Sequence, residues 1–536
     1  MTKGMISAPQ PEAVEAGLDV LQSGGNAVDA AIACALVQTA VDPQMCGIAG
    51  FGNIQLYLPK IGVHTTFDFH GRSPLATRPG MWEHLIEREA EDGWGFILKG
   101  RVNEIGYGAI STPRTLAAFE EVLRRFGTKS MAELIEPAIA YCEDGFMVRP
   151  HMSEFWNKPP TAGRDANISM LTKHPATRKI YCHFDGHALG VGEILKNPDM
   201  GRTYRRIAEH GVSDFYSGEI ADRIINDMKA NGGLIDHQDL AACSAEEKEP
   251  IWGNYRGYRY ATNHPPGGGV MLIEMLNILE NFDLAAMGHN SPEYIRVVSE
   301  AMKIATSDKD NKVGDPKFYD VPMEELTSKK YAASYAEAIR RGDKADVTRL
   351  NTGGQESKNT TQVTVVDEDG SCVTMTHTLG QPSGVITEGL GFMYNGAMTV
   401  FDPRPGRSGS LAPGKARFTA ISPTIVFKGD KPYLVLGAPG ATYITMGNLQ
   451  VMLNVMDFGM NAQEAVLAPR FAAVSNNIEL SNRILRACER DLLAQGYPVL
   501  RHPVSHTFSW VHAIRIVDGK LDGGADAATD GMAMSV

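Results

Sequence analysis

The chain has 536 residues, of which 43% are hydrophobic and 21% charged, an ordinary globular composition that is long enough to bury a large core. Its formal net charge of −12 and a sequence pI near 5.7 argue against a nucleic acid or an anionic membrane surface as a partner. Length alone would allow about two to four domains.

The start of the chain and its cysteines predict a location. Residues 1–11 lack the apolar core of a signal peptide, and the longest apolar stretch, residues 27–41, contains Asp29 and is too short to span a bilayer. The 7 cysteines are scattered without a CxxC pair, and the odd number leaves at least one thiol unpaired within the chain. We therefore expect a cytoplasmic protein without membrane contact.

The first quarter of the chain predicts two helices and then a strand. Apolar residues at helical spacing cover residues 12–41, and Ser-Gly-Gly-Asn at 23–26 is a stop-and-start signal that should join two helices. A glycine-rich segment at 47–52 leads into a strand expected at 53–58. Its glycine spacing is wrong for a dinucleotide-binding fingerprint, so close backbone packing is the better interpretation.

The segment 66–79 carries the first side chains with possible substrate chemistry, His70 and Arg72. Arg72 is a candidate for binding a charged group of a substrate. The alternative is a solvated surface charge, which is the more common role of an arginine in a loop.

The middle of the chain, residues 106–351, is mostly amphipathic helix. Its histidines, such as His183, His187 and His210, lie at no metal-ligand spacing, and there is no HExxH motif. The run at 308–311 resembles a calcium loop only superficially, because the glycine and the later acidic ligand are misplaced. We therefore expect no metal and no organic cofactor. The predicted helices are 115–126, 131–142, 218–229, 271–279 and 292–307.

Residues 359–378 predict a β-hairpin, because two strand-like runs flank Asp369-Gly370, a strong turn signal. Opposed positions in a hairpin have a constant index sum, so Thr360 should lie across from residue 377, 378 or 379, and the hydroxyls of Thr360 and Thr378 can meet. A threonine that becomes the first residue of its chain can use its own α-amine as a base. The alternative is that these threonines reflect strand propensity. The preceding segment, 351–358, is polar and glycine-rich and should be exposed and flexible.

The sequence of the last third of the chain predicts loops, a second hairpin and a turn whose backbone N–H groups could bind an anion. Glycine-rich residues 380–398 and a proline- and glycine-rich segment at 401–417 could form a loop over a pocket. Strands are expected at 422–427 and 433–437, followed by a turn at 439–442 that opens a helix to about residue 456. Backbone N–H groups at a turn before a helix favour negative charge, as in an oxyanion hole, although a plain strand-to-helix turn is the simpler alternative. For the last part of the chain we expect a helix at 483–495 and strands near 511–517. This part also carries two histidines, His506 and His512.

The hairpin resembles the start of the small subunit in the γ-glutamyltranspeptidase family of N-terminal-nucleophile hydrolases. The resemblance implies an α+β fold, a four-layer αββα sandwich formed by residues 1–536 as one domain. It also implies cleavage between Asn359 and Thr360 into fragments 1–359 and 360–536, which stay together as a heterodimer and leave open a dimer of such heterodimers. Seven further segments match in the family's order: 15–52, 136–146, 215–240, 264–280, 421–427, 437–442 and 464–471.

Roles for four residues follow from the resemblance. Thr360 would be the nucleophile with its α-amine as general base, and Thr378 would orient it. The backbone amides of Gly440 and Ala441 would form the oxyanion hole. The expected activity is hydrolysis of an amide bond in a small molecule through an acyl-enzyme.

The positions that would bind a γ-glutamyl group depart from the family. An arginine, an acidic residue, an asparagine and a serine pair are replaced here, and a glutamine of some members becomes Ala397. We therefore expect a different acyl group. Two alternatives stay open: a true γ-glutamyltransferase that uses other contacts, such as Arg72 and Asp402, and an uncleaved, non-enzymatic scaffold. The departing positions are His70, Val400, Gly380, Thr419 and Ala420.

Overall fold

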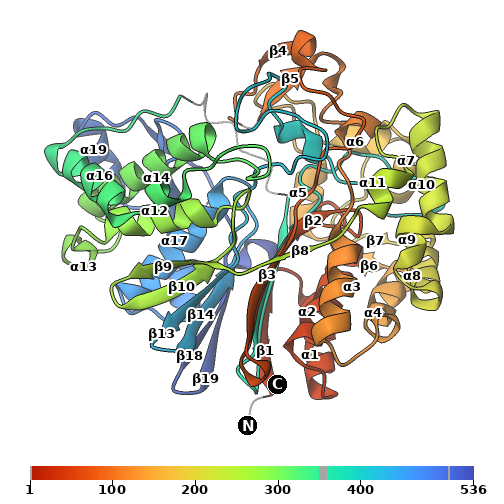
Figure 1. Cartoon of the computed structure of the whole chain (residues 1–536), viewed down its shortest axis with the longest axis horizontal. Coiled ribbons are helices and arrows are strands. Elements are labelled where there is room, and N and C mark those ends of the chain that lie inside the picture. The colour runs from red at the N-terminus through yellow and green to blue at the C-terminus, as the bar shows by residue number, and fades with distance from the viewer. Residues whose placement is uncertain (1–2, 94, 349–358, 505–507) are drawn as a thin grey trace.

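The computed structural model describes residues 3–93, 95–348, 359–504 and 508–536. Two antiparallel β-sheets lie face to face at the centre, and a layer of helices covers the outer face of each (Figure 1). This is the four-layer αββα sandwich that the sequence predicts. Strands β1 and β20 bring the first described residue and the last residue together at the lower edge of the first sheet (Figure 1), where the backbone N–H of Lys3 donates to the carbonyl of Val536.

The first sheet contains the predicted hairpin in its middle. In the described residues its strand order is β20-β1-β11-β12-β2-β3-β8, and every residue of β11 and β12 is buried. Since helices cover one face and the second sheet covers the other, these two strands lie in the interior on both faces. The strands of the first sheet are β20 (Met532–Ser535), β1 (Gly4–Ala8), β11 (Thr361–Asp367), β12 (Cys372–Thr378), β2 (Phe51–Leu58), β3 (Val63–Phe69) and β8 (Glu246–Lys248).

The second sheet packs against the hairpin through β14 and β18. Its order in the described residues is β19-β18-β14-β13-β10-β9. The predicted second hairpin is confirmed as β13 and β14, with an irregularity between Val426 and Phe427. The strands are β19 (Lys520–Ala525), β18 (His512–Val517), β14 (Lys431–Gly437), β13 (Thr424–Lys428), β10 (Tyr258–Thr262) and β9 (Ile251–Tyr255).

The helices next to the first sheet include the two expected around residues 23–26. Asn26 begins the second of them with a capping box, in which its side chain accepts from the N–H of Asp29 and the Asp29 carboxylate accepts from the N–H of Asn26. That helix, α2, is alanine-rich and entirely buried, so it can pack closely against its neighbours α1 and α4 and strand β11. The main helices of this layer are α1 (Pro11–Gln22), α2 (Ala27–Val41), α3 (Thr115–Phe126), α4 (Met131–Asp144), α8 (Pro198–His210) and α10 (Glu219–Ala230).

The helices next to the second sheet are built around α12 and α17, which contact each other and are apolar around most of their circumference. Helices of this kind need cover on all sides, and the longer amphipathic helices supply it from outside. The layer consists of α12 (Gly269–Leu279), α14 (Pro292–Lys312), α16 (Lys329–Arg341), α17 (Tyr443–Met456), α18 (Ala462–Leu467) and α19 (Arg486–Ala494).

Short elements connect these layers. They are α5 (Pro150–Trp156), α6 (Ile168–Thr172), α7 (Pro175–Tyr181), α9 (Ser213–Ser217), α11 (His237–Ala241), α13 (Leu284–Met287), α15 (Met323–Leu326), β4 (Ile86–Glu89), β5 (Phe96–Leu98), β6 (Phe146–Met147), β7 (Ile194–Leu195), β15 (Phe471–Ala472), β16 (Ile478–Leu480) and β17 (Val499–Arg501). Within the described ranges no helix is both long enough and apolar enough to cross a bilayer. All 7 cysteines lie in these ranges, and each is a free thiol.

Candidate active site

The hairpin places the two threonine hydroxyls together. Strands β11 and β12 pair with Thr361 opposite His377, so the next position outward brings Thr360 opposite Thr378. Gly370 has φ +77° in the connecting turn, a left-handed conformation that glycine adopts without strain. The register predicted from the sequence is therefore confirmed.

Thr378 connects the groups at the open end of the hairpin. Its hydroxyl oxygen lies 3.0 Å from Thr360 Oγ1 and accepts from the backbone N–H of Gly380 at 2.8 Å. The same hydroxyl donates to the carbonyl oxygen of Asn359 at 2.5 Å. Asn359, Thr360 and Thr378 are buried and Gly380 is partly buried, so hydrogen bonds largely fix the mutual orientation of these groups.

The peptide bond between Asn359 and Thr360 lies directly at these hydroxyls. Thr360 Oγ1 is hydrogen-bonded to the carbonyl oxygen of Asn359, which also accepts from Thr378. A hydroxyl donating to a carbonyl oxygen withdraws electron density from the carbonyl carbon and stabilises the negative charge that develops there during attack. The arrangement can therefore support attack of Thr360 Oγ1 on its own preceding carbonyl.

Replacing Thr378 with valine tests this arrangement, because valine has the same shape without the hydroxyl. We expect cleavage before Thr360 to slow, and turnover by the cleaved protein to fall about 10- to 1000-fold, as for losing one orienting or electrostatic hydrogen bond at an active site. The time course of cleavage on a denaturing gel and kcat of the cleaved form are the measurements. Thr376→Val is the matched control, since it removes a buried hydroxyl from the same strand, one that donates to Gln362 at 2.6 Å. Equal losses in both variants would mean a general effect on the strand.

The candidate oxyanion hole follows β14. Gly440 has φ +138°, and a side chain there would come within 2.7 Å of Ser509. Ala441 has φ +52° and lines the same cavity as Thr360. In the part of the chain that the structure describes, neither backbone N–H donates a hydrogen bond to another residue. The predicted turn at 439–442 and the helix after it are confirmed, since helix α17 begins at Tyr443 and ends at Met456. Residues 440 and 441 have non-helical dihedral angles, so they stay outside the helix.

The left-handed conformation of Ala441 predicts a gain in stability for Ala441→Gly. An L-residue other than glycine loses about 1–2 kcal/mol in this conformation, and the greater freedom of glycine in the unfolded chain offsets about 0.5–1 kcal/mol of that. We expect a modestly higher Tm with cleavage retained, since the N–H group stays in place. Thermal unfolding of both cleaved proteins checks this, and a lower Tm for the glycine variant would contradict it.

A small cavity of about 30 Å³ lies beside Thr360 in the intact chain. Gly380, Thr419 and Ala420, all predicted as substrate contacts, line it. The sequence interpretation missed Arg417, which also lines it and is only 4% exposed. The available signal was an arginine two positions before Thr419, within the loop expected to cover a pocket. The other lining residues are Phe51, Asn359, Thr378, Gln381, Ile421, Ala441 and Ile444.

His70 supports the wall of this cavity from behind. Its Nδ1 lies 2.5 Å from Asp68 Oδ1, and its Nε2 lies 2.7 Å from Thr419 Oγ1. Burial raises the pKa of Asp68, but His70 and Lys248 outweigh burial and hold that pKa below its usual range. Asp68 is therefore a carboxylate at neutral pH that fixes the ring of His70, and His70 in turn positions the Thr419 hydroxyl.

Arg72 lies in an ion-pair cluster outside the lining of the small cavity. Its guanidinium contacts Glu246 at 2.6 Å and Asp315 at 3.3 Å, and it donates to the carbonyl of Gly414 at 3.0 Å. These contacts tie β8 and the loop before Thr419 together. The structure thus gives Arg72 a different position from the one expected of a substrate contact.

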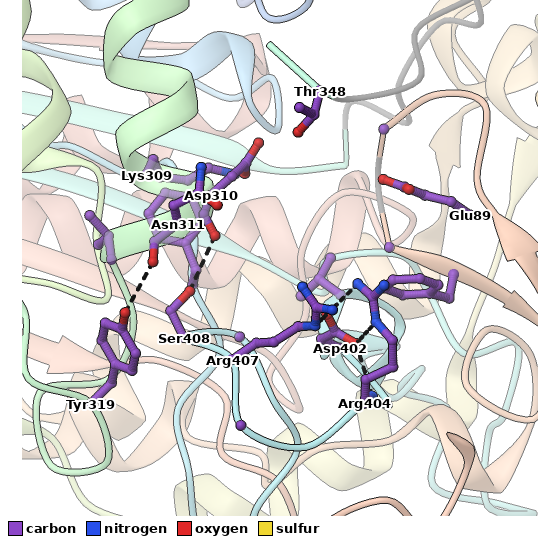
Figure 2. A pocket seen from close by; sticks show the side chains of 18 residues that line it. Glu89, Lys309, Asp310, Asn311, Tyr319, Thr348, Asp402, Arg404, Arg407 and Ser408 are labelled. Carbon is purple, nitrogen blue, oxygen red and sulfur yellow. Dashed lines mark hydrogen bonds and ion pairs between the residues drawn. The ribbon is translucent and has the colours of Figure 1, made fainter. Parts of the chain in front are cut away.

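Val400 and Asp402 line a second, larger cavity of about 510 Å³ (Figure 2). Figure 2 shows Asp402 held by Arg404, with Asp402 Oδ2 2.7 Å from Arg404 Nη2. Arg407 approaches the same carboxylate to 3.6 Å. Ala397 is buried and begins the short 3₁₀ turn Ala397–Val400, which precedes Asp402 in the chain. Binding a substrate ammonium with Asp402 would require breaking its pair with Arg404.

The sequence also drew attention to His506, His512 and the polar segment 351–358. His512 is buried on β18, where burial lowers its pKa to about 4, and it contacts Ser7 at 3.5 Å and not the small cavity. His506 and the segment 351–358, expected to be flexible, lie outside the described residues. Within the described residues no cluster of His, Cys, Asp and Glu side chains could hold a metal ion.

The fold has four layers of αββα type, and Thr360 lies directly before a central strand, with the hydroxyl of Thr378 beside it. This arrangement defines a hydrolase of the N-terminal-nucleophile class. The chain belongs to the gamma-glutamyltranspeptidase family, whose family model matches residues 13–536. It is 35% identical to the acylase ACY 1 proenzyme of Pseudomonas sp. (strain V22), over 100% of this chain and 94% of that protein. It is 34% identical to the glutathione hydrolase proenzyme of Escherichia coli (strain K12), over 88% of this chain and 80% of that protein.

Solved structures agree with this assignment. The cephalosporin acylase from Bacillus halodurans superposes with a TM-score of 0.86 at 27% identity, covering 99% of this chain and 96% of that one. The gamma-glutamyltranspeptidase of Helicobacter pylori superposes with a TM-score of 0.55 at 31% identity, covering 62% of this chain and 90% of that one. The chain is therefore similar both to acylases and to glutathione hydrolases.

Proposed function

We propose that this protein is a self-processing acylase that hydrolyses an amide bond of a small molecule through Thr360. The observation that carries the proposal is the contact of both threonine hydroxyls with the carbonyl of Asn359, inside a cavity next to the turn of Gly440 and Ala441. The proenzyme names of the acylase and glutathione hydrolase relatives support a maturation step.

Maturation would begin with attack of Thr360 Oγ1 on the carbonyl carbon of Asn359. The C–N bond breaks, the nitrogen takes the proton of the hydroxyl, and an ester links Asn359 to Thr360 Oγ1. Water then hydrolyses the ester, which leaves the carboxylate of Asn359 on fragment 1–359 and a free α-amine on Thr360. The two fragments share the first sheet, since β1, β2, β3 and β8 come from the first fragment and β11, β12 and β20 from the second, so they should remain together as a heterodimer.

Catalysis would follow a similar course on an external amide, now with the α-amine that cleavage has released as the base. The α-amine of Thr360 takes the proton of the hydroxyl as Oγ1 attacks the substrate carbonyl, and the N–H groups of Gly440 and Ala441 stabilise the oxyanion. The amine product leaves with that proton, and water, activated by the same α-amine, hydrolyses the acyl-enzyme. Every proton and bond is accounted for by residues of this chain and water.

The acyl group is proposed to lack the α-ammonium of a γ-glutamyl group. Val400 offers no carboxylate, Asp402 is paired with Arg404, and Arg72 is paired with Glu246 and Asp315. A second candidate, hydrolysis or transfer of γ-glutamyl groups, is favoured by the 34% identity to a glutathione hydrolase proenzyme. For the location we propose the cytoplasm, a reducing compartment, in view of the odd number of cysteines.

Mass spectrometry of the purified protein together with a substrate screen tests the proposal. We expect two chains, 1–359 and 360–536, and hydrolysis of amides by the cleaved form. A single chain of 58.2 kDa that hydrolyses no amide would overturn it and favour the scaffold alternative. Two chains that hydrolyse only γ-glutamyl amides would favour the second candidate.

A further inference from the structure

Gln381 is a buried amide in the wall of the small cavity beside Thr360. The residue is 9% exposed, and its Oε1 is fully buried but accepts no hydrogen bond from any described residue. An unpaired buried acceptor costs free energy, so such atoms in native proteins are usually paired with a protein group or with an ordered water. Its place in the cavity wall therefore points to a partner inside the cavity.

The backbone on both sides of Gln381 is held in place. On one side, the N–H of Gly380 donates to Thr378 Oγ1 at 2.8 Å. On the other side, Pro382 pairs with Asn395 in an isolated β-bridge, and a proline also restricts the conformation of the residue before it. The side chain of Gln381 therefore starts from a backbone that is fixed relative to the hydroxyls of the hairpin.

The cavity has room for one water molecule. Its volume of about 30 Å³ exceeds the roughly 10–15 Å³ that one water needs. Asn359 and Thr360, the two residues that the ester of maturation would join, line the same cavity. A water held there would lie beside both the ester carbonyl and the α-amine released on Thr360.

We propose that Gln381 positions the water molecule that hydrolyses the ester between Asn359 and Thr360 Oγ1. The inference rests on the proposed self-processing and adds a positioning residue to its second step. One O–H of the water donates to Gln381 Oε1 and the other to the α-amine of Thr360. A lone pair of the water oxygen then faces the ester carbonyl carbon, which is the orientation that attack requires.

Protons and bonds balance in this step. The water oxygen bonds to the carbonyl carbon of Asn359 while the α-amine of Thr360 takes one water proton. The bond between that carbon and Oγ1 breaks, and Oγ1 takes the proton back from the ammonium. The new carboxylic acid of Asn359 gives its proton to the α-amine, which leaves a carboxylate and an ammonium. Gln381 accepts a hydrogen bond throughout and exchanges no proton.

Gln381→Met tests this role, because methionine has an unbranched side chain of similar length without the amide. Formation of the ester should be unaffected, whereas its hydrolysis by water should slow about 100-fold, the cost of misplacing a reacting group by about 1 Å. Hydroxylamine added to the folded variant should restore cleavage, since it attacks esters without a positioned water. Mass spectrometry should then find fragment 1–359 as a hydroxamate, heavier than the carboxylate by one NH group. Gln381→Glu keeps an acceptor oxygen in place and should be cleaved by water.

Gln55→Met is the matched control. Gln55 is also buried with an unpaired Oε1 among the described residues, but it lies on β2 and does not line the small cavity. It should be cleaved at the wild-type rate. Cleavage of Gln381→Met by water at the wild-type rate would overturn the inference. A folded Gln381→Met chain that neither water nor hydroxylamine cleaves would also overturn it, since the loss would then precede the ester.

A crystal structure of Thr360→Ala decides the question if Gln381→Met does not fold. This variant has no attacking hydroxyl and should stay whole, so the cavity keeps both sides of the uncleaved bond. We expect an ordered water within hydrogen-bond distance of the Gln381 amide, and a cavity without one would overturn the inference. These outcomes leave the proposed function intact. A wild-type chain that stays whole even with hydroxylamine would overturn the proposed function, and this inference with it.

Discussion

Thr360→Ala is expected to abolish cleavage, so that the purified variant runs as one chain of 58.2 kDa and hydrolyses no amide. The variant lacks Oγ1, the atom that contacts the carbonyl of Asn359 and Thr378 in the intact chain. Without it no ester can form at residue 359, and no α-amine becomes available at residue 360. Thr360→Ser keeps the hydroxyl and should be cleaved, at a lower rate because serine has more rotamer freedom than a β-branched threonine. Intact-mass spectrometry after purification is the measurement.

Thr361→Ala is the control that separates this role from a general effect of altering the strand. Thr361 is the adjacent buried threonine, and its hydroxyl interacts with the side chain of Gln10 on the other face of the sheet, at 3.2 and 3.3 Å. We expect Thr361→Ala to be cleaved normally at residue 359. Cleavage of Thr360→Ala, or a cut at another position in the wild-type chain, would exclude Thr360 as the attacking residue.

The position of the two hydroxyls could be predicted because it depends on local rules. Asp369-Gly370 fixes the turn, and the turn fixes the register that brings Thr360 opposite Thr378. The helices on either side of residues 23–26 were predictable for a similar reason, since the capping signal at Asn26 and Asp29 is contained in four residues. Strand β2 begins at Phe51, two residues before the predicted start, because pairing with β12 extends it.

The place of Arg417 in the cavity wall could not be predicted, because it depends on contacts between distant segments. Arg72 and Arg417 are both loop arginines, and no local pattern distinguishes them. Arg72 meets Glu246 and Asp315, which lie far along the chain, whereas Arg417 stacks on Phe51 at the start of a strand more than three hundred residues earlier. The packing of these loops decides which arginine faces Thr360, and sequence periodicity carries no information about it.

The cleaved enzyme is expected to hydrolyse a glutaryl amide about 100- to 4000-fold better than the γ-glutamyl amide of the same amine. The two substrates differ only in the α-ammonium group. The resemblance to the family assigns Val400 to the position where a carboxylate would bind the ammonium, and in the larger cavity Asp402 is held by Arg404. The small cavity beside Thr360 has the cation of Arg417 in its wall. An ammonium buried there is uncompensated, at about 3–5 kcal/mol, and each 1.4 kcal/mol is a tenfold difference in kcat/KM.

The measurement is kcat/KM for the two p-nitroanilides with the same preparation of cleaved enzyme, at a pH near 7 where the α-ammonium is charged. Val400→Asp is an informative partner variant, because a carboxylate at that position should raise kcat/KM for the γ-glutamyl substrate and lower it for the glutaryl one if position 400 faces the acyl group. A γ-glutamyl substrate that is better by about tenfold in the wild type would contradict this description of the site. It would mean that Asp402 leaves Arg404 to bind the ammonium, and Asp402→Asn should then abolish the γ-glutamyl activity.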